Sequence, residues 1–290
     1  MIPRFSLARP RSLAEAFEAF AGAGGEGAYI AGGTELLQVM KMGFAQFETL
    51  IDVKGLDELR GIDTSEGAIR IGATTTHRTI ERSAGILAAF PGLVDLERHV
   101  ANVRVRSTGT LGGNLAFAEP HSDPATLLLA SDARVELEGP AGARALRLSE
   151  FILGPLATAR EPEEILTGVR IPAARRGEGR AYGKIAFFER PAASVAVRLT
   201  VADGAVTEAT VAVGSLTEVP LIVKPAGDAL VGTEVDPEPF ANAIASASAA
   251  FGALDAVEDL NGSSDYKRHL AGVLLASTCR AAVREATARA

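Results

Sequence analysis

The sequence is poor in the residues that build disulfides and metal sites. It holds one cysteine in 290 residues, which excludes an internal disulfide, an iron–sulfur cluster and a cysteine-based zinc site on this chain. That residue, Cys279, stands in the apolar stretch "LAGVLLASTCRAAV", which predicts a buried structural thiol rather than a nucleophile. The four histidines show no H-x-x-x-H or H-E-x-x-H spacing. We therefore expect no metal site on this chain.

Clustered positive charge and long apolar runs are also missing. The net charge is −7, from 36 acidic and 29 basic residues, and no Lys/Arg cluster marks a nucleic-acid face. No apolar run reaches the length of a membrane span, and the first residues lack the apolar core of a signal peptide. We expect a cytoplasmic protein that binds no nucleic acid. A length of 290 residues and 47% hydrophobic residues suit two globular domains.

Helix and strand signals alternate irregularly over the first 175 residues. Capping-box spacing at Ser12 and Glu15 predicts a helix that stops in "AGAGGEG", and a second helix is expected over 35–42, capped by Thr34 and ended by Gly43. Ser122 or Asp123 can cap a wholly apolar, buried helix, "PATLLLA". Strands are expected at 28–31, 49–53, 68–73, 134–139 and 165–172, with helical runs around 76–82 and 93–100.

The polar stretch 172–180 is the candidate boundary between two domains. Strand-like runs with a turn at Asp203-Gly204 follow it over 193–216, and two helices begin near Pro237 and Asp265. Strands that precede helices, rather than alternating with them, favour an α+β fold over a doubly wound parallel sheet.

Two adjacent glycines join a short strand to a helix in "YIAGGTELLQVMKMG", residues 29–43. A glycine turn that leads into a helix gathers unpaired backbone N–H groups, an arrangement that suits an anion such as phosphate. The alternative is that these glycines only form a tight turn.

A second glycine segment, "STGTLGGNLA" at 107–116, repeats this arrangement. Its glycines stand between Thr110 and Asn114, whose side chains can donate hydrogen bonds to phosphate oxygens. Neither segment has the P-loop or the G-x-G-x-x-G pattern. Two such segments can clasp a pyrophosphate from both sides, which makes a dinucleotide the candidate ligand.

The motifs around both segments resemble those of one family. "AGGTELL" and "RSTGTLGGNLAFAEPHSDPATLLLA" are similar to the A-G-G-x-x and T-[IL]-G-G-N loops of the FAD-binding medium subunits of molybdenum hydroxylases, the xanthine dehydrogenase and carbon monoxide dehydrogenase family. The resemblance continues through "FSLARPRSLAEA", "EILTGVRIP", "AYGKIAFFERP" and "DYKRHLAGVLLA", so it spans nearly the whole chain. The cysteine-rich insertion of the benzoyl-CoA reductase branch is absent. Thr34-Glu35 replaces the His-Ser of carbon monoxide dehydrogenase chains, which argues against carbon monoxide as the substrate.

This resemblance implies a fold and a division into domains. The expected fold is α+β, with a two-lobed FAD-binding domain of the vanillyl-alcohol-oxidase type and a smaller α+β domain after it. The FAD-binding domain is expected over 1–175, with lobes of approximately 1–57 and 58–175, and the C-terminal domain over 180–290.

The resemblance also implies residues that bind FAD, without a covalent bond. Asp123 matches a cofactor contact and also suits a helix cap, Leu166 matches an apolar wall position or is simply core, and Lys184 matches a basic residue near the cofactor or is a surface lysine. Arg106 is expected to hold the second segment, and His121 to face solvent or a partner rather than carry a covalent flavin. The cofactor-binding set is Ala31, Gly32, Gly33, Thr34, Glu35, Leu36, Thr110, Leu111, Gly112, Gly113, Asn114, Asp123, Leu166 and Lys184.

The implied function is electron transfer. A large subunit would carry the molybdenum cofactor and hydroxylate the substrate, and a small subunit with [2Fe–2S] clusters would pass electrons to FAD on this chain. NAD or a quinone would be the acceptor, in a dimer of heterotrimers. No catalytic residue is required here, in agreement with the lack of a Ser/His/Asp or paired-carboxylate signature. The alternatives are a stand-alone flavin oxidase or reductase of the same fold and a non-catalytic nucleotide-binding subunit.

Overall fold

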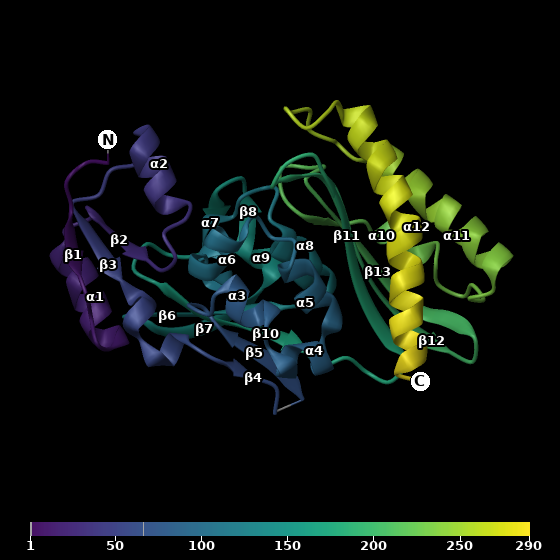
Figure 1. Cartoon of the computed structure of the whole chain (residues 1–290), viewed down its shortest axis with the longest axis horizontal. Coiled ribbons are helices and arrows are strands. Elements are labelled where there is room, and N and C mark those ends of the chain that lie inside the picture. Colours follow the sequence, from purple (N-terminus) through teal and green to yellow (C-terminus); the bar gives the residue numbers. More distant parts are fainter. Residues whose placement is uncertain (1, 66) are drawn as a thin grey trace.

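The computed structural model describes residues 2–65 and 67–290. Three parts lie side by side along the long axis: an N-terminal lobe, a central region and a C-terminal region that ends in the long helix α12 (Ser264–Ala288) (Figure 1). Each part is built on its own sheet, and strands and helices are mixed throughout. The α+β class expected from the sequence is confirmed.

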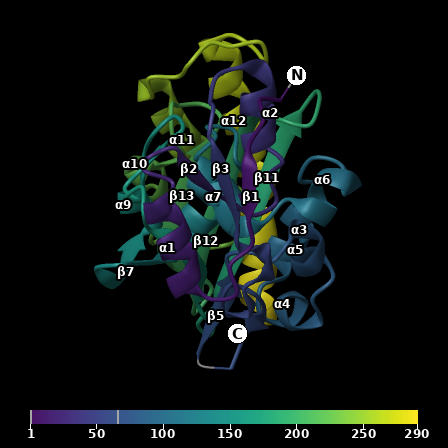
Figure 2. The ribbon, with the colours of Figure 1, turned by 90° about the vertical axis from the view of Figure 1, so that its left-hand side faces the viewer.

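The N-terminal lobe is a three-stranded parallel sheet with two helices, seen in front in Figure 2. The strand order is β1-β3-β2, so the strand of the first glycine segment lies at one edge. The elements are β1 (Ser6–Ala8), α1 (Leu13–Gly22), β2 (Gly27–Ile30), α2 (Leu36–Met42), β3 (Thr49–Asp52) and the short helices η1 (Val53–Gly55) and η2 (Asp57–Leu59).

The signals for helix α1 are confirmed, with one difference in its cap. Ser12 Oγ accepts a hydrogen bond from the Glu15 N–H at 3.2 Å, as a capping box requires. The Glu15 carboxylate, however, accepts from the N–H of Arg11 at 2.8 Å rather than from that of Ser12. The cap is therefore half of the expected box, and it still satisfies two N–H groups of the helix start.

The expected cap of helix α2 is wrong. The helix begins at Leu36, the N-cap position is Glu35, and no side chain caps it. The chain first turns at Gly33, which has a φ of +70°, and this turn leaves Thr34 one residue too early to act as the cap. The expected end is confirmed, because Gly43 has a left-handed φ of 82° that a helix end favours.

The central region is a five-stranded sheet, in the order β4-β5-β10-β6-β7, with its helices packed on one side (Figure 1). All recorded pairs in it are antiparallel. The strands are β4 (Ile62–Asp63), β5 (Ala68–Gly72), β6 (Arg134–Gly139), β7 (Gly142–Arg147) and β10 (Ile165–Pro172), with a separate hairpin of β8 (Ile152–Gly154) and β9 (Ala157–Thr158).

The helices of the central region carry the second glycine segment. They are α3 (His77–Glu81), α4 (Ala84–Ala89), α5 (Pro91–Glu97), α6 (Val103–Thr108), α7 (Leu111–Phe117), α8 (Asp123–Ala130) and α9 (Leu148–Phe151). Helix α8 is buried along its whole length, as its composition predicts, and Ser122 is its cap. The glycines expected in a loop instead lie in the first turn of α7, with Thr110 as its N-cap. Helix α6 was not predicted.

The C-terminal region is a four-stranded antiparallel sheet covered by helices. Its strands are β11 (Glu178–Ala186), β12 (Pro191–Ala202), β13 (Ala205–Gly214) and β14 (Leu221–Ile222), and its helices are α10 (Lys224–Asp228), α11 (Pro237–Ala249), η3 (Ala250–Ala253) and α12. The expected turn joins β12 to β13, with φ of 50° at Asp203 and 78° at Gly204. Helix α12 lies along β11 and β12, and α8 packs on the opposite face of the sheet.

Side chains along β12 and β13 alternate between the two faces of the sheet, so each face packs against different helices. Val195, Val197 and Val213 belong to the core shared with α11 and α12, whereas Ala196 and Ala212 belong to the core around α8. Small alanines on the α8 side let that helix approach the sheet closely. The division at 172–180 stays a prediction, although the chain crosses from one core to the other there.

Candidate functional site

The two glycine segments, which are far apart in sequence, touch one another. A Cβ on Gly32 would lie 2.7 Å from the Cα of Gly109 and would also meet the carbonyl oxygen of Thr108. A Cβ on Gly109 would in turn lie 3.4 Å from the hydroxyl of Thr34. Glycine is therefore required at position 32 for the two backbones to approach each other.

The first segment presents unpaired hydrogen-bond donors. In residues 2–65 and 67–290, no hydrogen bond is recorded for the backbone N–H groups of residues 32–35. Residues 31–36 are all half-buried, so these groups lie at the surface of the site rather than in the core. A run of free N–H groups around a residue with positive φ, here Gly33, is an arrangement that binds anions.

The second segment has its donors occupied. The Leu111 N–H donates to the Thr75 carbonyl at 3.1 Å and the Gly112 N–H to the Ala73 carbonyl at 2.9 Å. The Gly113 N–H donates to the hydroxyl of Thr110 at 3.1 Å. Asn114 accepts from the Ser122 hydroxyl through Oδ1 at 2.5 Å, which leaves its amide nitrogen to donate elsewhere.

Asp123, Lys184 and Tyr182 form a buried polar cluster behind the second segment. Lys184 Nζ lies 2.6 Å from Asp123 Oδ2 and donates to the His99 carbonyl at 2.8 Å, while the Tyr182 hydroxyl donates to Asp123 Oδ1. Burial raises the pKa of Asp123, and the Lys184 ammonium opposes that rise. Burial also raises the pKa of Tyr182 well above its usual value. Lys184 is therefore no solvated surface lysine, since its side chain is only 14% exposed.

Leu166 lies in β10 with 6% of its surface exposed, in the same core as Leu111 and Leu115 of α7. It therefore packs in the core that supports the second segment. Whether it also forms a wall of the cofactor site stays a prediction, and the same holds for direct cofactor contacts of Asp123 and Lys184.

Arg106 is held by its own surroundings. Its guanidinium donates to Glu81 Oε2 at 3.1 Å and to the carbonyls of Val100 and Ala101 at 3.0 and 3.2 Å. It thus links the turn before α6 to α3, and α6 leads directly into the second segment.

His121 is half-buried and bound within the chain, and whether it also faces a partner stays a prediction. Its Nδ1 lies 2.9 Å from Glu119 Oε1 and its Nε2 lies 2.9 Å from Asp259 Oδ2, and its side chain is 17% exposed. Both ring nitrogens are thus engaged by carboxylates. Cys279 is fully buried in α12, and burial raises the pKa of its thiol to about 12, in agreement with a structural role.

A buried His77–Glu97 pair was missed by the sequence analysis. His77 Nδ1 lies 2.8 Å from Glu97 Oε2, and the His77 ring lies against Gly109. Burial lowers the pKa of His77, but the charge and hydrogen bond of Glu97 together with the charge of Asp123 raise it, and the net shift is upward. The two residues are 20 positions apart with no shared motif, and only the packing of α3 on α5 brings them together.

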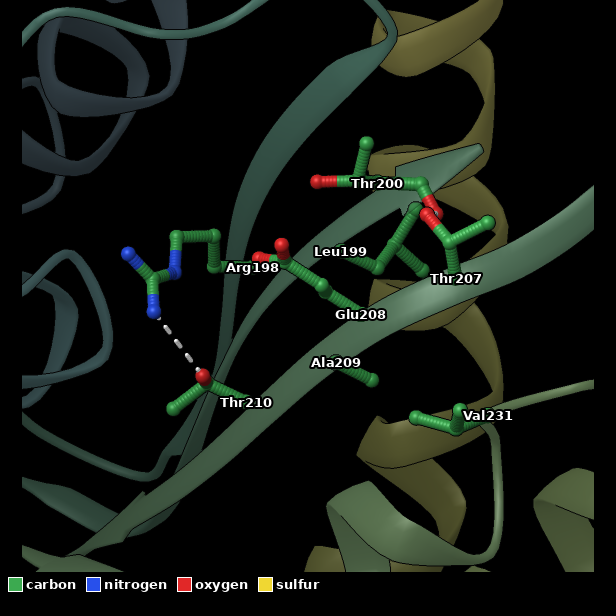
Figure 3. A pocket seen from close by; sticks show the side chains of 8 residues that line it. All are labelled: Arg198, Leu199, Thr200, Thr207, Glu208, Ala209, Thr210 and Val231. Carbon is green, nitrogen blue, oxygen red and sulfur yellow. Dashed lines mark hydrogen bonds between the residues drawn. The ribbon is translucent and has the colours of Figure 1, made fainter. Parts of the chain in front are cut away.

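Two hollows of the surface lie elsewhere. One of about 320 Å³ lies over β12 and β13, where Arg198 donates to Thr210 at 3.2 Å and Val231 closes the far side (Figure 3). Another, of about 470 Å³, lies between η3 and α12. Neither is lined by residues of the glycine segments.

Two family models match the chain, one in each half. Residues 3–174 match the FAD binding domain in molybdopterin dehydrogenase, and residues 189–282 match the CO dehydrogenase flavoprotein C-terminal domain. These matches define the class of the chain as a flavoprotein component of molybdenum enzymes.

Curated relatives and solved structures agree. The carbon monoxide dehydrogenase medium chain of Afipia carboxidovorans is 34% identical, over 100% of this chain and 99% of that one. The nicotine 6-hydroxylase medium subunit of Paenarthrobacter nicotinovorans is 32% identical, over 96% of each. Carbon monoxide dehydrogenase from Hydrogenophaga pseudoflava gives a TM-score of 0.92 at 33% identity, over 98% of this chain and 99% of that chain. Quinoline 2-oxidoreductase from Pseudomonas putida 86 gives 0.92 at 28%, over 99% of each.

The chain therefore belongs to the FAD-binding medium subunits of the molybdenum hydroxylase family. It is an FAD-binding oxidoreductase subunit of a multi-subunit complex. Within the described parts of the chain, no group of three or more potential metal ligands occurs, and no helix is long and apolar enough to cross a membrane.

Proposed function

We propose that the first glycine segment binds the diphosphate of FAD and that the chain relays electrons from [2Fe–2S] clusters on a partner subunit to NAD or a quinone. The observation that carries this proposal is the row of unpaired N–H groups at residues 32–35, beside the contact of Gly32 with Gly109. FAD carries a negatively charged diphosphate, which these donors suit.

The residues present fit FAD, with the two glycine segments in different roles. Residues 31–36 would supply backbone donors and the Thr34 hydroxyl, for which no hydrogen bond is recorded in the described residues. Residues 110–114 would contribute the free amide of Asn114 and a rigid support, because Leu111 and Gly112 are already bonded to the strand end at 73–75. Asp123, Leu166 and Lys184 would hold that support in place and border the cofactor on its protein side.

Bound FAD supplies a centre that exchanges electrons singly or in pairs, which suits a position between one-electron carriers and a two-electron acceptor. The chain's own residues bind and orient that centre. We assign no proton transfer to any of them, since substrate hydroxylation belongs to a partner subunit.

The assembly we propose has a large molybdenum-cofactor subunit and a small iron–sulfur subunit beside this chain, in a cytoplasmic dimer of heterotrimers. The relatives are themselves a medium chain and a medium subunit, which supports partners of both sizes.

An absorbance spectrum of the purified chain, before and after acid precipitation, tests the proposal. We expect a yellow protein that releases FAD into the supernatant. Colour that stays in the pellet would indicate a covalent flavin, and a folded chain that binds no added FAD would overturn the proposed site.

The site itself is tested by Gly32→Ala against Gly55→Ala. Gly55 has no neighbour within 4 Å of an added Cβ, so its substitution is a matched control. Gly32→Ala should lose most of its FAD while Gly55→Ala keeps it; equal FAD content in the two variants would place the cofactor elsewhere.

A further inference from the structure

Six charged side chains form a continuous series from the first glycine segment to α12. Arg190 Nη2 lies 3.9 Å from Glu35 Oε2, and its Nη1 lies 3.3 Å from Glu119 Oε1. His121 lies 2.9 Å from both Glu119 and Asp259. Lys267 Nζ ends the series, 2.6 Å from Asp259 Oδ2. The charges alternate in sign at every step when His121 is protonated.

The series joins all three parts of the molecule. Glu35 belongs to the N-terminal lobe, and Glu119 and His121 connect α7 to α8 in the central region. Arg190 lies in the loop between β11 and β12, and Asp259 precedes α12 in the C-terminal region. The same loop is tied to the start of α6 by a hydrogen bond from Asn102 Nδ2 to Glu189 Oε1 at 2.6 Å. One loop of the C-terminal region thus contacts the first glycine segment and residues on either side of the second.

The inner end of this series is firmly anchored. Lys267 is fully buried and donates to the Ser215 carbonyl at 3.1 Å as well as binding Asp259. Burial raises the pKa of Asp259, but hydrogen bonds from Lys267, His121 and Asn261 lower it further, to about 2. Asp259 is therefore ionised at neutral pH, and it offers His121 a negative charge.

The other end of the series, at Glu35, carries a negative charge that would repel a bound phosphate. Glu35 contributes one of the free N–H groups, yet its carboxylate lies on the same residue and repels a phosphate. Burial raises the pKa of Glu35, and the Arg190 guanidinium opposes that rise. Arg190 is 57% exposed and contacts carboxylates on two different parts of the molecule. Its positive charge both neutralises Glu35 and ties the first segment to the C-terminal region.

We propose that Arg190 is a positioning residue that retains FAD, by neutralising Glu35 and latching the first glycine segment to the C-terminal region, and that protonated His121 completes this latch. The inference rests on the proposed FAD site at residues 31–36. It predicts that the cofactor leaves faster when the latch carries one positive charge fewer.

The first arm of the test removes the charge of Arg190. FAD release from the full chain is followed by the recovery of flavin fluorescence after dilution, in Arg190→Gln, Arg190→Lys and Arg175→Gln. Arg175 is the matched control, since it is 56% exposed and pairs with two carboxylates, Glu178 and Glu208, away from the site. We expect release about fivefold faster for Arg190→Gln at low salt, with partial rescue by lysine and no change for Arg175→Gln.

Ionic strength and a double variant distinguish the latch from a general loss of structure. High salt should speed release from the unaltered chain and leave Arg190→Gln nearly unaffected. In a Glu35→Gln background, Arg190→Gln should lose part of its effect because the repulsion is already gone. If the unaltered chain binds FAD and Arg190→Gln releases it at the same rate, the latch is wrong. If the unaltered chain binds no FAD, the proposed site fails instead.

The second arm titrates His121 between about pH 6 and pH 9. The hydrogen bond with Glu119 raises the pKa of His121, burial opposes it, and Asp259 adds to the rise. The charged groups that face it are Glu119 and Asp259, with Arg190 and Lys267 behind them. Release from the unaltered chain should therefore quicken as pH rises and His121 loses its proton.

The control for this arm is another histidine. His121→Asn should show fast release with a flat pH profile, whereas His269→Asn, altered at an exposed position, should keep the profile of the unaltered chain. A pH profile that persists in His121→Asn would overturn the role of this histidine.

Discussion

The two glycine segments look alike in sequence and differ in what their backbones do. Both read as paired glycines among small polar residues at the start of a helix. In the first, the N–H groups of residues 32–35 have no recorded partner in the described chain. In the second, Leu111 and Gly112 donate to carbonyls at 73–75, and Gly113 donates to its own cap. One segment offers donors to a ligand, and the other supports it.

The difference comes from the neighbours of each segment. The second segment runs beside the end of β5. The two stretches of chain are so close there that a Cβ on Gly112 would lie 2.5 Å from the Cβ of Ala73. The first segment turns at the edge of a small sheet, where no strand reaches its N–H groups. A glycine pair in the sequence therefore indicates that another group lies close to the backbone. Only the structure shows whether that group is protein or leaves room for a ligand.

The largest effect is expected where the second segment is supported by buried charge. Lys184→Met leaves Asp123 buried without its ammonium, and should lower the free energy of unfolding by about 3 kcal/mol. Lys54→Met, at a lysine that is 47% exposed and pairs with Asp52, should change it by less than about 1 kcal/mol. Chemical denaturation measures both. The double variant Asp123→Asn/Lys184→Met should regain stability; if it does not, packing rather than charge accounts for the loss.

Alanine at each of the two glycines should lower stability and FAD affinity in different proportions. Gly112→Ala forces α7 away from Ala73 and should cost about 2 kcal/mol of stability, with FAD affinity falling as a consequence. Gly32→Ala pushes against Thr108 and Gly109 at the surface of the site, so FAD affinity should fall more than stability does. Denaturation and FAD titration of both variants check this. If the ratio of affinity loss to stability loss is the same in both variants, the two segments do not differ in role.

A threonine in each segment gives a finer comparison. Thr110→Ala removes the cap of α7 and should cost about 1 kcal/mol. Thr34→Ala removes a hydroxyl with no recorded partner in the described residues, so it should leave stability unchanged and weaken FAD binding a few-fold. Thermal unfolding and FAD titration separate the two results. A stability loss at Thr34 as large as that at Thr110 would contradict a ligand role for Thr34.

The smallest effect expected is the pH dependence of stability. The pKa values of His77 and His121 are raised in the folded chain, so protonation stabilises it. That stabilisation is complete below about pH 6.5, the ordinary value, and is lost as pH rises through the folded pKa. The denaturation midpoint should therefore fall toward alkaline pH. Glu97→Gln should flatten this fall because it removes the carboxylate charge that raises the pKa of His77. An unchanged slope would show that the pair does not contribute.

Local signals in the sequence predicted much of the fold. Capping at Ser12, the left-handed turn at Gly43 and the Asp203-Gly204 turn all lie where expected, because each depends on a few adjacent residues. Helix α6 was missed, and so was the helical start at Leu111. Their short sequences carry no long apolar period, and contacts with residues 73–77 stabilise the start of α7.

The candidate site divides in the same way. The motifs identified the residues of both glycine segments and the family, but not that Lys184 is buried against Asp123, nor that His121 lies between Glu119 and Asp259. Those pairs join residues 61 and 138 positions apart in sequence. No local pattern encodes such a contact.

The sequence by itself determined the class of fold, the absence of a cysteine-based cluster and the two places where the backbone must be free of a side chain. Propensity, capping and the lack of a Cβ act over a few residues, and a sequence displays them directly. Tertiary structure alone decided which glycine segment keeps its donors free and which charges meet Arg190. Hydrogen bonds and ion pairs form with whatever groups the fold brings within about 3 Å, and the packing of the sheets and helices decides which groups those are.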